Sequence, residues 1–76
     1  MNAKQCKMAR AATGLGVREL AALAGVAQAT VSRLERGEDL RTVTVEAIRT
    51  ALENAGVEFI SENGGGAGVR LKKGET

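Results

Sequence analysis

The sequence predicts a mainly α fold, a compact bundle of helices followed by a short C-terminal β-hairpin. Up to Gly56, apolar residues recur at intervals of three and four, the spacing of one face of an α-helix, and after Gly56 the period changes to two. The 76-residue chain also holds a single aromatic residue, Phe59. A core built from Ala, Leu, Val, Ile and Met favours closely packed helices over a sandwich of sheets.

The first helix is expected at residues 3–12. Asn2, followed three residues later by Gln5, has the pattern of a capping box, in which two side chains satisfy free backbone amides at a helix start. The inner face would carry Cys6 and Ala9 at helical spacing. Cys6 is therefore interpreted as a small buried hydrophobic residue.

Residues 17–36 predict two short helices joined by a tight turn. The preceding loop would place Leu15 in the core and use Gly16 as the helix N-cap. Gly25 interrupts the apolar stripe, where a helix has to end in a left-handed conformation. Ala21 has to be small because the second helix packs against it at a steep angle. The apolar residues of this stretch are Leu20, Leu23, Ala24, Val26, Val31 and Leu34.

A further helix is expected at residues 43–54. Leu40, in the link before it, would reach back into the core, and either Thr42 or Thr44 would cap its start. Gly56 would supply the left-handed residue at its end. Its inward stripe consists of Val45, Ile48, Ala51, Leu52 and Ala55.

The last segment has the pattern of a β-hairpin with a glycine-rich connection. A two-stranded hairpin is marginal alone in water, so Phe59 and Leu71 are expected to pack on the bundle. The hairpin could also pair edge to edge with a second chain; the alternative is a mobile tail from Gly64 onward. The expected organisation is a helical domain at 1–56, a hairpin extension and candidate dimerisation element at 57–73, and a tail at 74–76.

The second helix of the pair, from about Gln28 to Arg36, has a polar outward face. Base edges in the major groove of DNA are read at close range by bidentate side chains. Arg33 suits the O6 and N7 of guanine, Gln28 suits the N6 and N7 of adenine, and Ala29 offers a methyl group to thymine. We therefore expect base contacts from Gln28, Ala29, Ser32 and Arg33.

Charge is distributed unevenly along the chain. The formal net charge is only +2, but residues 1–36 carry +4, residues 37–69 carry −4 and residues 70–76 carry +2. The basic segment thus coincides with the pair of helices. A polyanion would be steered to that side before any base is read.

The stretch LAALAGVAQATVSRLERG resembles the helix-turn-helix of the phage-repressor and Cro-like (XRE-type) family of transcriptional regulators. The resemblance covers roughly residues 5–55. It implies a compact bundle of four or five helices, in which the second and third form the motif, bound to DNA as a two-fold dimer. It also implies a partly buried ion pair between Arg10 and Glu35. The matching positions are Ala21, Gly25, Val26, Val31 and Leu34.

The same resemblance indicates which residues contact the DNA backbone. The family commonly has Gln at the first position of the second helix, where this chain has Val17, so Arg18 is the expected replacement. In related repressors the stretch after the third helix runs along the backbone, which makes Arg41 and Thr42 candidates. The acids at 38–39 would be repelled there unless they point away. The expected phosphate contacts are Arg18, Thr30, Arg36, Arg41 and Thr42.

Other classes of function lack the residues they need. The chain has no histidine and one cysteine, which argues against a metal site, an internal disulfide and a cofactor. Ser32 and Cys6 have no base to activate them, so an enzyme is not expected. The glycine-rich stretch lacks the Lys-Ser or Lys-Thr of a P-loop. No stretch is apolar enough to span a bilayer and no signal peptide is visible, so a cytoplasmic protein is expected.

Two functions from different classes remain. The first is a sequence-specific transcriptional regulator that binds double-stranded DNA as a homodimer. The second is an antitoxin-type or accessory protein-interaction module that uses the same helical corner, or the hairpin, to hold a protein partner. A groove for a partner helix should be apolar, whereas the exposed face at 28–36 is polar, which favours DNA.

Overall fold

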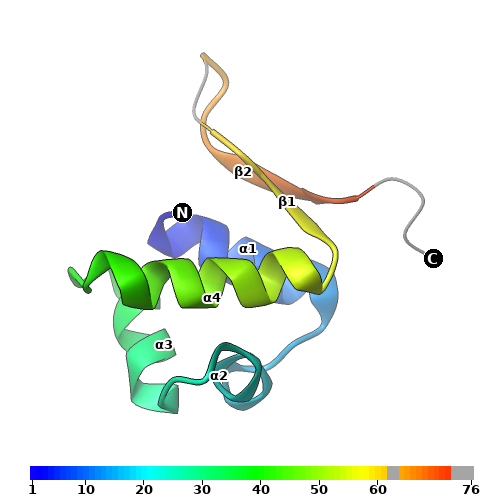
Figure 1. Cartoon of the computed structure of the whole chain (residues 1–76). Coiled ribbons are helices and arrows are strands. Elements are labelled where there is room, and N and C mark those ends of the chain that lie inside the picture. The colour runs from blue at the N-terminus through cyan, green and yellow to red at the C-terminus, as the bar shows by residue number, and fades with distance from the viewer. Residues whose placement is uncertain (62–63, 73–76) are drawn as a thin grey trace.

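The structure of the protein is a computed structural model that describes residues 1–61 and 64–72. The described chain forms four helices and one β-hairpin (Figure 1). The helices are α1 (Ala3–Thr13), α2 (Val17–Ala24), α3 (Gln28–Glu35) and α4 (Thr42–Asn54), and the strands are β1 (Val57–Ile60) and β2 (Gly68–Leu71). The mainly α fold class with a C-terminal hairpin is confirmed. The predicted tail at 74–76, residue 73 of the hairpin extension and residues 62–63 of the connection lie outside the described residues.

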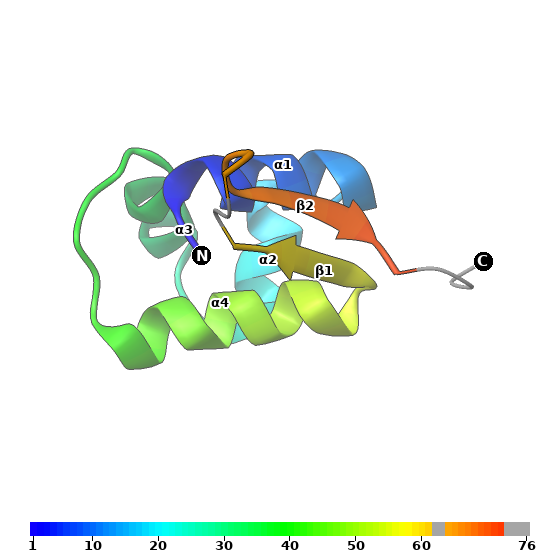
Figure 2. The same ribbon diagram turned by 90° about the horizontal axis from the view of Figure 1, so that it is seen from above.

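The elements form three levels. Seen from above, α1 and α4 run alongside each other, and the hairpin lies over the space between them (Figure 2). The helices α2 and α3 lie on the opposite side of α1 and α4 from the hairpin (Figure 1). The pair of helices that sequence analysis singled out is therefore held away from the hairpin.

Helix α1 begins with the predicted capping box. The Gln5 backbone amide donates to Asn2 Oδ1 at 2.8 Å, and the Asn2 backbone amide donates to Gln5 Oε1 at 2.9 Å. The helix continues one residue beyond the predicted end at residue 12, and the Thr13 hydroxyl donates back to the Ala9 carbonyl oxygen at 2.8 Å. None of the four described helices combines the length with the apolar composition that a membrane-spanning segment needs.

The ends of α3 and α4 differ from the predictions. Helix α3 ends at Glu35, with Arg36 as its C-cap instead of its last residue. Helix α4 begins one residue early, at Thr42, and its N-cap is Arg41, which makes no side-chain capping bond. The predicted cap by Thr42 or Thr44 is therefore wrong: both lie inside the helix, and the Arg41 carbonyl accepts the first helical bonds, from Thr44 and Val45, at 3.0 and 3.1 Å.

The core is formed by small and medium aliphatic side chains. Leu20, Ile48 and Leu52 are its largest fully buried members. Leu15 and Leu40 are partly buried and pack against it, as predicted for both loops. The other buried apolar residues are Cys6, Ala9, Ala21, Val31, Leu34, Ala51 and Val57. Because these come from all four helices and from β1, the core sets the angles between the helices.

The hairpin is antiparallel and is tied to α1 through Gln5. In its register, Val57 pairs with Leu71 and Phe59 pairs with Val69. The Gln5 side-chain amide donates to the carbonyl oxygens of Ile60 and Gly68, at 3.0 and 3.1 Å. Through these bonds Gln5, which is 5% exposed, connects the start of α1 to the far end of the strand ladder.

One of the two predicted hairpin anchors is wrong. Phe59 packs against the core as expected, under the guanidinium of Arg49, which lies 5.5 Å from the ring centroid. Leu71, in contrast, is 51% exposed. Val57 follows α4 after two residues, Ala55 and Gly56, and is fully buried. Its cross-strand neighbour Leu71 is the last residue of β2 and lies at the rim of the sheet. Val69 packs against the core in its place.

Candidate functional site

The corner between α2 and α3 is built on Gly25. Its φ of 71° and ψ of 32° are left-handed, and a Cβ built there would have no atom within 4 Å. The requirement for glycine is therefore one of backbone conformation and not of space. The Val26 amide donates to the Ala21 carbonyl oxygen at 3.0 Å and closes the corner. Ala21 is 3% exposed, as expected for the position where the two helices meet.

Helix α3 presents one buried and one exposed face. Val31, Leu34 and Glu35 are buried. On the other face Gln28, Ala29 and Arg33 are exposed and Ser32 is half-buried. Helical spacing brings these four predicted base-contacting residues together on successive turns. In the described residues Arg33 makes no ion pair, so its guanidinium is free to bind an outside acceptor.

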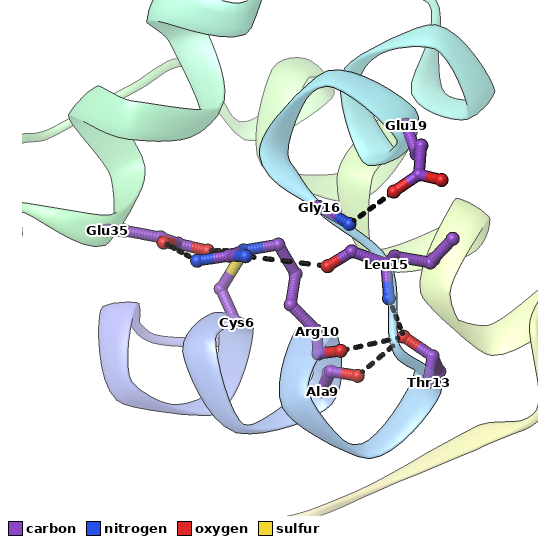
Figure 3. A network of polar contacts seen from close by, with 8 residues as sticks. All are labelled: Cys6, Ala9, Arg10, Thr13, Leu15, Gly16, Glu19 and Glu35. Atoms are coloured by element: carbon purple, nitrogen blue, oxygen red, sulfur yellow. Dashed lines mark hydrogen bonds and ion pairs between the residues drawn. The ribbon is translucent and has the colours of Figure 1, made fainter.

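The back of α3 is fixed to α1 by a bidentate ion pair (Figure 3). Arg10 Nε donates to Glu35 Oε2 at 2.7 Å, and Arg10 Nη2 donates to Glu35 Oε1 at 2.8 Å. The Cys6 thiol donates to the same Oε2 at 3.2 Å. Arg10 Nη1 also reaches the Leu15 carbonyl oxygen at 3.4 Å. This contact set orients α3 against α1 with directional bonds, whereas apolar packing alone would let the helix rotate.

These contacts alter the proton affinities of the buried groups. Hydrogen bonds from Arg10 hold the pKa of Glu35 below its usual range, against the opposing effect of burial. Burial, reinforced by the bond to Glu35, raises the pKa of the Cys6 thiol to about 12. Cys6 therefore stays protonated and donates to the carboxylate, and its reactivity as a nucleophile is low.

The predicted backbone contacts come from three separate places. Arg18 is exposed on the first turn of α2, Thr30 is half-buried on α3, and Arg41 and Thr42 are exposed at the start of α4. The N-terminus of α2 already holds an acid, because the Gly16 amide donates to Glu19 Oε1 at 2.7 Å. Arg18, Arg41 and Thr42 thus come from helix starts on either side of α3 in the sequence, and Thr30 belongs to α3 itself.

The remaining predicted backbone contact, Arg36, has a partner that sequence analysis did not foresee. Its Nε and Nη2 both donate to Glu38 Oε2, at 3.1 and 2.9 Å. The bond from Cys6 to Glu35 was missed as well, although Cys6 lies one helical turn before Arg10 and so could have been placed beside its partner. Within the described residues no three His, Cys, Asp or Glu side chains are grouped to hold a metal ion.

Comparison with known proteins identifies one family model. Residues 4–58, which include nearly all of the four helices and the start of β1, match the model of a family described as a helix-turn-helix domain. No individual curated protein matches the chain. The matched range contains every residue for which a DNA contact was predicted.

Proposed function

The chain belongs to the family of helix-turn-helix domains, and on that premise we propose that it is a sequence-specific transcriptional regulator that binds double-stranded DNA as a homodimer. Helix α3 enters the major groove and reads the base edges. The observation that carries this proposal is the polar, exposed face of α3 on a corner held by Gly25 and by the Arg10–Glu35 pair. The proposed role is one of binding, without catalysis or a cofactor, in the cytoplasm.

Base recognition is assigned to the exposed face of α3. Arg33, which has no internal ion pair in the described chain, donates in bidentate fashion to a guanine. Gln28 lies at the N-terminal end of the helix, the end that contacts base edges in this mode of docking, and it pairs with an adenine. Ala29 and Ser32 lie between Gln28 and Arg33 on this face and contact the bases at shorter range, because their side chains are short.

Contacts with the DNA backbone set the position of α3 in the groove. Arg18, Arg41 and Thr42 are exposed at helix starts, and Thr30 lies on α3 itself. Such contacts add affinity that does not depend on sequence and fix the register of the protein on the duplex. Their electrostatic part weakens as salt is added.

Dimerisation doubles the number of bases read. An eight-residue helix such as α3 covers only a short stretch of groove, and two copies related by a two-fold axis read two half-sites about one helical turn apart. The hairpin is the proposed contact between copies. In the described residues β1 and β2 pair only with each other, so each strand keeps an edge that a second chain can extend.

A second candidate function is an antitoxin-type or accessory protein-interaction module. The observation that favours it is an open hollow of about 460 Å³ between α2 and α4, lined by both apolar and polar side chains. Leu23 and Val43 border it and are 61% and 67% exposed. A protein partner that covers this hollow would contact the helical corner from the side of α4.

The test is selection of bound duplexes from a random-sequence pool, carried out with the wild-type protein, with Arg33→Ala and with Arg41→Ala. Arg41 is exposed at the start of α4 and is assigned to the DNA backbone, so it serves as a control of equal charge. We expect a two-fold-symmetric consensus that Arg33→Ala degrades at one position in each half-site and that Arg41→Ala leaves intact. No enrichment, with only weak and salt-sensitive binding, would reject sequence-specific binding and favour the interaction module.

A further inference from the structure

An exposed ion pair lies at the C-terminal end of α3, the proposed recognition helix. Both Nε and Nη2 of Arg36 donate to one oxygen of Glu38, Oε2, at 3.1 and 2.9 Å. The two side chains are 62% and 50% exposed. The pair thus stands in solvent, beside the face that carries Arg33.

The backbone turn after α3 brings Glu38 to this place. Gly37 has a φ of 87°, and its amide donates to the Leu34 carbonyl oxygen at 3.0 Å. The Glu38 amide donates to the Arg33 carbonyl oxygen at 3.1 Å. Glu38 is therefore tied to the last turn of the helix, and its carboxylate lies where the helix end already carries partial negative charge.

The pair adds little to the stability of the fold, because exposed ion pairs are weakened by water and by the loss of side-chain freedom. Its effect on the affinity for a DNA phosphate is larger. A guanidinium binds carboxylate and phosphate oxygens with the same N–H donors, so a DNA phosphate and Glu38 compete for Arg36. The negative charge of Glu38 also repels a phosphate that approaches the helix end.

Resting on the function proposed above, we propose that Glu38 is an internal competitor for the DNA backbone: it holds Arg36 in the free protein and yields it to a phosphate on binding. Glu38 thereby lowers the affinity for every duplex by the same factor. Because phosphates carry no base information, the ratio between specific and non-specific affinity is left to the other residues of α3.

The chain supplies a matched control for this competition. Arg49 and Glu53 form a second arginine–glutamate pair, with side chains 37% and 39% exposed, toward the C-terminal end of α4. That end of α4 lies away from α3 in both views (Figures 1 and 2). Glu38→Gln and Glu53→Gln therefore change the net charge equally and remove a similar pair, but only the first is next to α3.

The experiment measures the affinity of the full chain for a labelled random-sequence duplex over a series of salt concentrations. For Glu38→Gln we expect several-fold tighter binding at low salt and a plot of log affinity against log salt that is steeper by about one, because the charge that Arg36 brings to the DNA is no longer offset by the charge of Glu38. Glu53→Gln should leave the slope unchanged. Arg36→Gln added to Glu38→Gln should remove the gain in slope.

The outcomes separate this inference from the function on which it rests. If the wild-type protein does not bind duplexes even at low salt, DNA binding is rejected and the competition with it. If the wild type binds but Glu38→Gln has the same slope as the wild type, or changes no more than Glu53→Gln does, only the role of Glu38 is overturned. A steeper slope in Glu38→Gln that persists without Arg36 would also overturn it.

Discussion

Arg10 on α1 and Glu35 on α3 form a bidentate ion pair, in which the Glu35 side chain is 9% exposed and the Arg10 side chain is 25% exposed. The Cys6 thiol completes the carboxylate's set of donors at 3.2 Å. A buried carboxylate with three hydrogen bonds is stable only while its donors are in place. The orientation of the proposed recognition helix thus depends on a polar contact across the core.

Arg10→Met is expected to lower the free energy of unfolding by about 3 kcal/mol, because it leaves the charge of Glu35 buried without its cation. This loss is large for a small domain with a thin core. Chemical denaturation measures it. Arg70→Met, which breaks an exposed pair, is the control and should cost less than about 1 kcal/mol. Equal losses in the two variants would contradict the structural role of the Arg10–Glu35 pair.

Acid should destabilise the protein through Glu35. Because its pKa is lower in the folded state than in the unfolded chain, Glu35 contributes stability above the unfolded value of about 4.3, and this contribution is lost as pH falls through the folded pKa. Unfolding free energies of the wild type and Glu35→Gln, measured from neutral to acid pH, should converge over that window. Parallel curves would show that the carboxylate is not held by Arg10.

Alkali should destabilise the protein through Cys6. Its pKa is raised to about 12 in the folded state, so stability is fully present below the unfolded value of about 8.5 and falls as pH rises toward 12. The slope contributed by one such group is about 1.4 kcal/mol per pH unit. The difference in unfolding free energy between the wild type and Cys6→Ser should shrink by that slope. The same thiol should resist modification in the native protein, and rapid modification at neutral pH would contradict its burial.

Gly25→Ala is expected to destabilise the protein by about 1 to 3 kcal/mol, since a side chain is costly at a φ of 71°. Gly25→Val should cost more because the β-branched side chain resists this conformation further. Gly65→Ala is the control, because Gly65 has no neighbouring atom within 4 Å and no positive φ. Thermal unfolding compares the three variants. An unchanged melting temperature for Gly25→Val would contradict the position of the corner.

Arg33→Ala and Arg41→Ala should differ in how they weaken DNA binding. Loss of Arg33 should cost about 1 to 3 kcal/mol on the selected site and relax the preference at one position in each half-site. Loss of Arg41 should weaken all duplexes alike and flatten the salt dependence. Affinities for the selected and a scrambled duplex, measured at several salt concentrations, distinguish the two. An equal loss on both duplexes for Arg33→Ala would reject its role in reading bases.

Local patterns in the sequence were sufficient to predict the helices and strands and the face that α3 exposes. The capping box at Asn2 and the left-handed Gly25 depend on neighbours a few residues away, so periodicity and residue type predict them. The predicted cap of α4 was wrong because Arg41 and Thr42 are adjacent and helix ends are weakly specified by sequence. The Arg10–Glu35 pair was expected from the family resemblance alone and not from any local pattern.

Contacts between distant residues were decided by the tertiary structure. Gln5 reaches Ile60 and Gly68, 55 and 63 residues away, and Cys6 reaches Glu35, 29 residues away. The exposure of Leu71 and the choice of Glu38 as the partner of Arg36 depend on how strands and turns lie in space. Residue type and spacing predicted each helix to within one residue at its ends, and the polar side of α3, because backbone preferences and hydrophobic period act over a few residues. The packing of the assembled elements decided which polar groups meet, since a hydrogen bond requires atoms to lie within about 3 Å of each other whatever their separation in the chain.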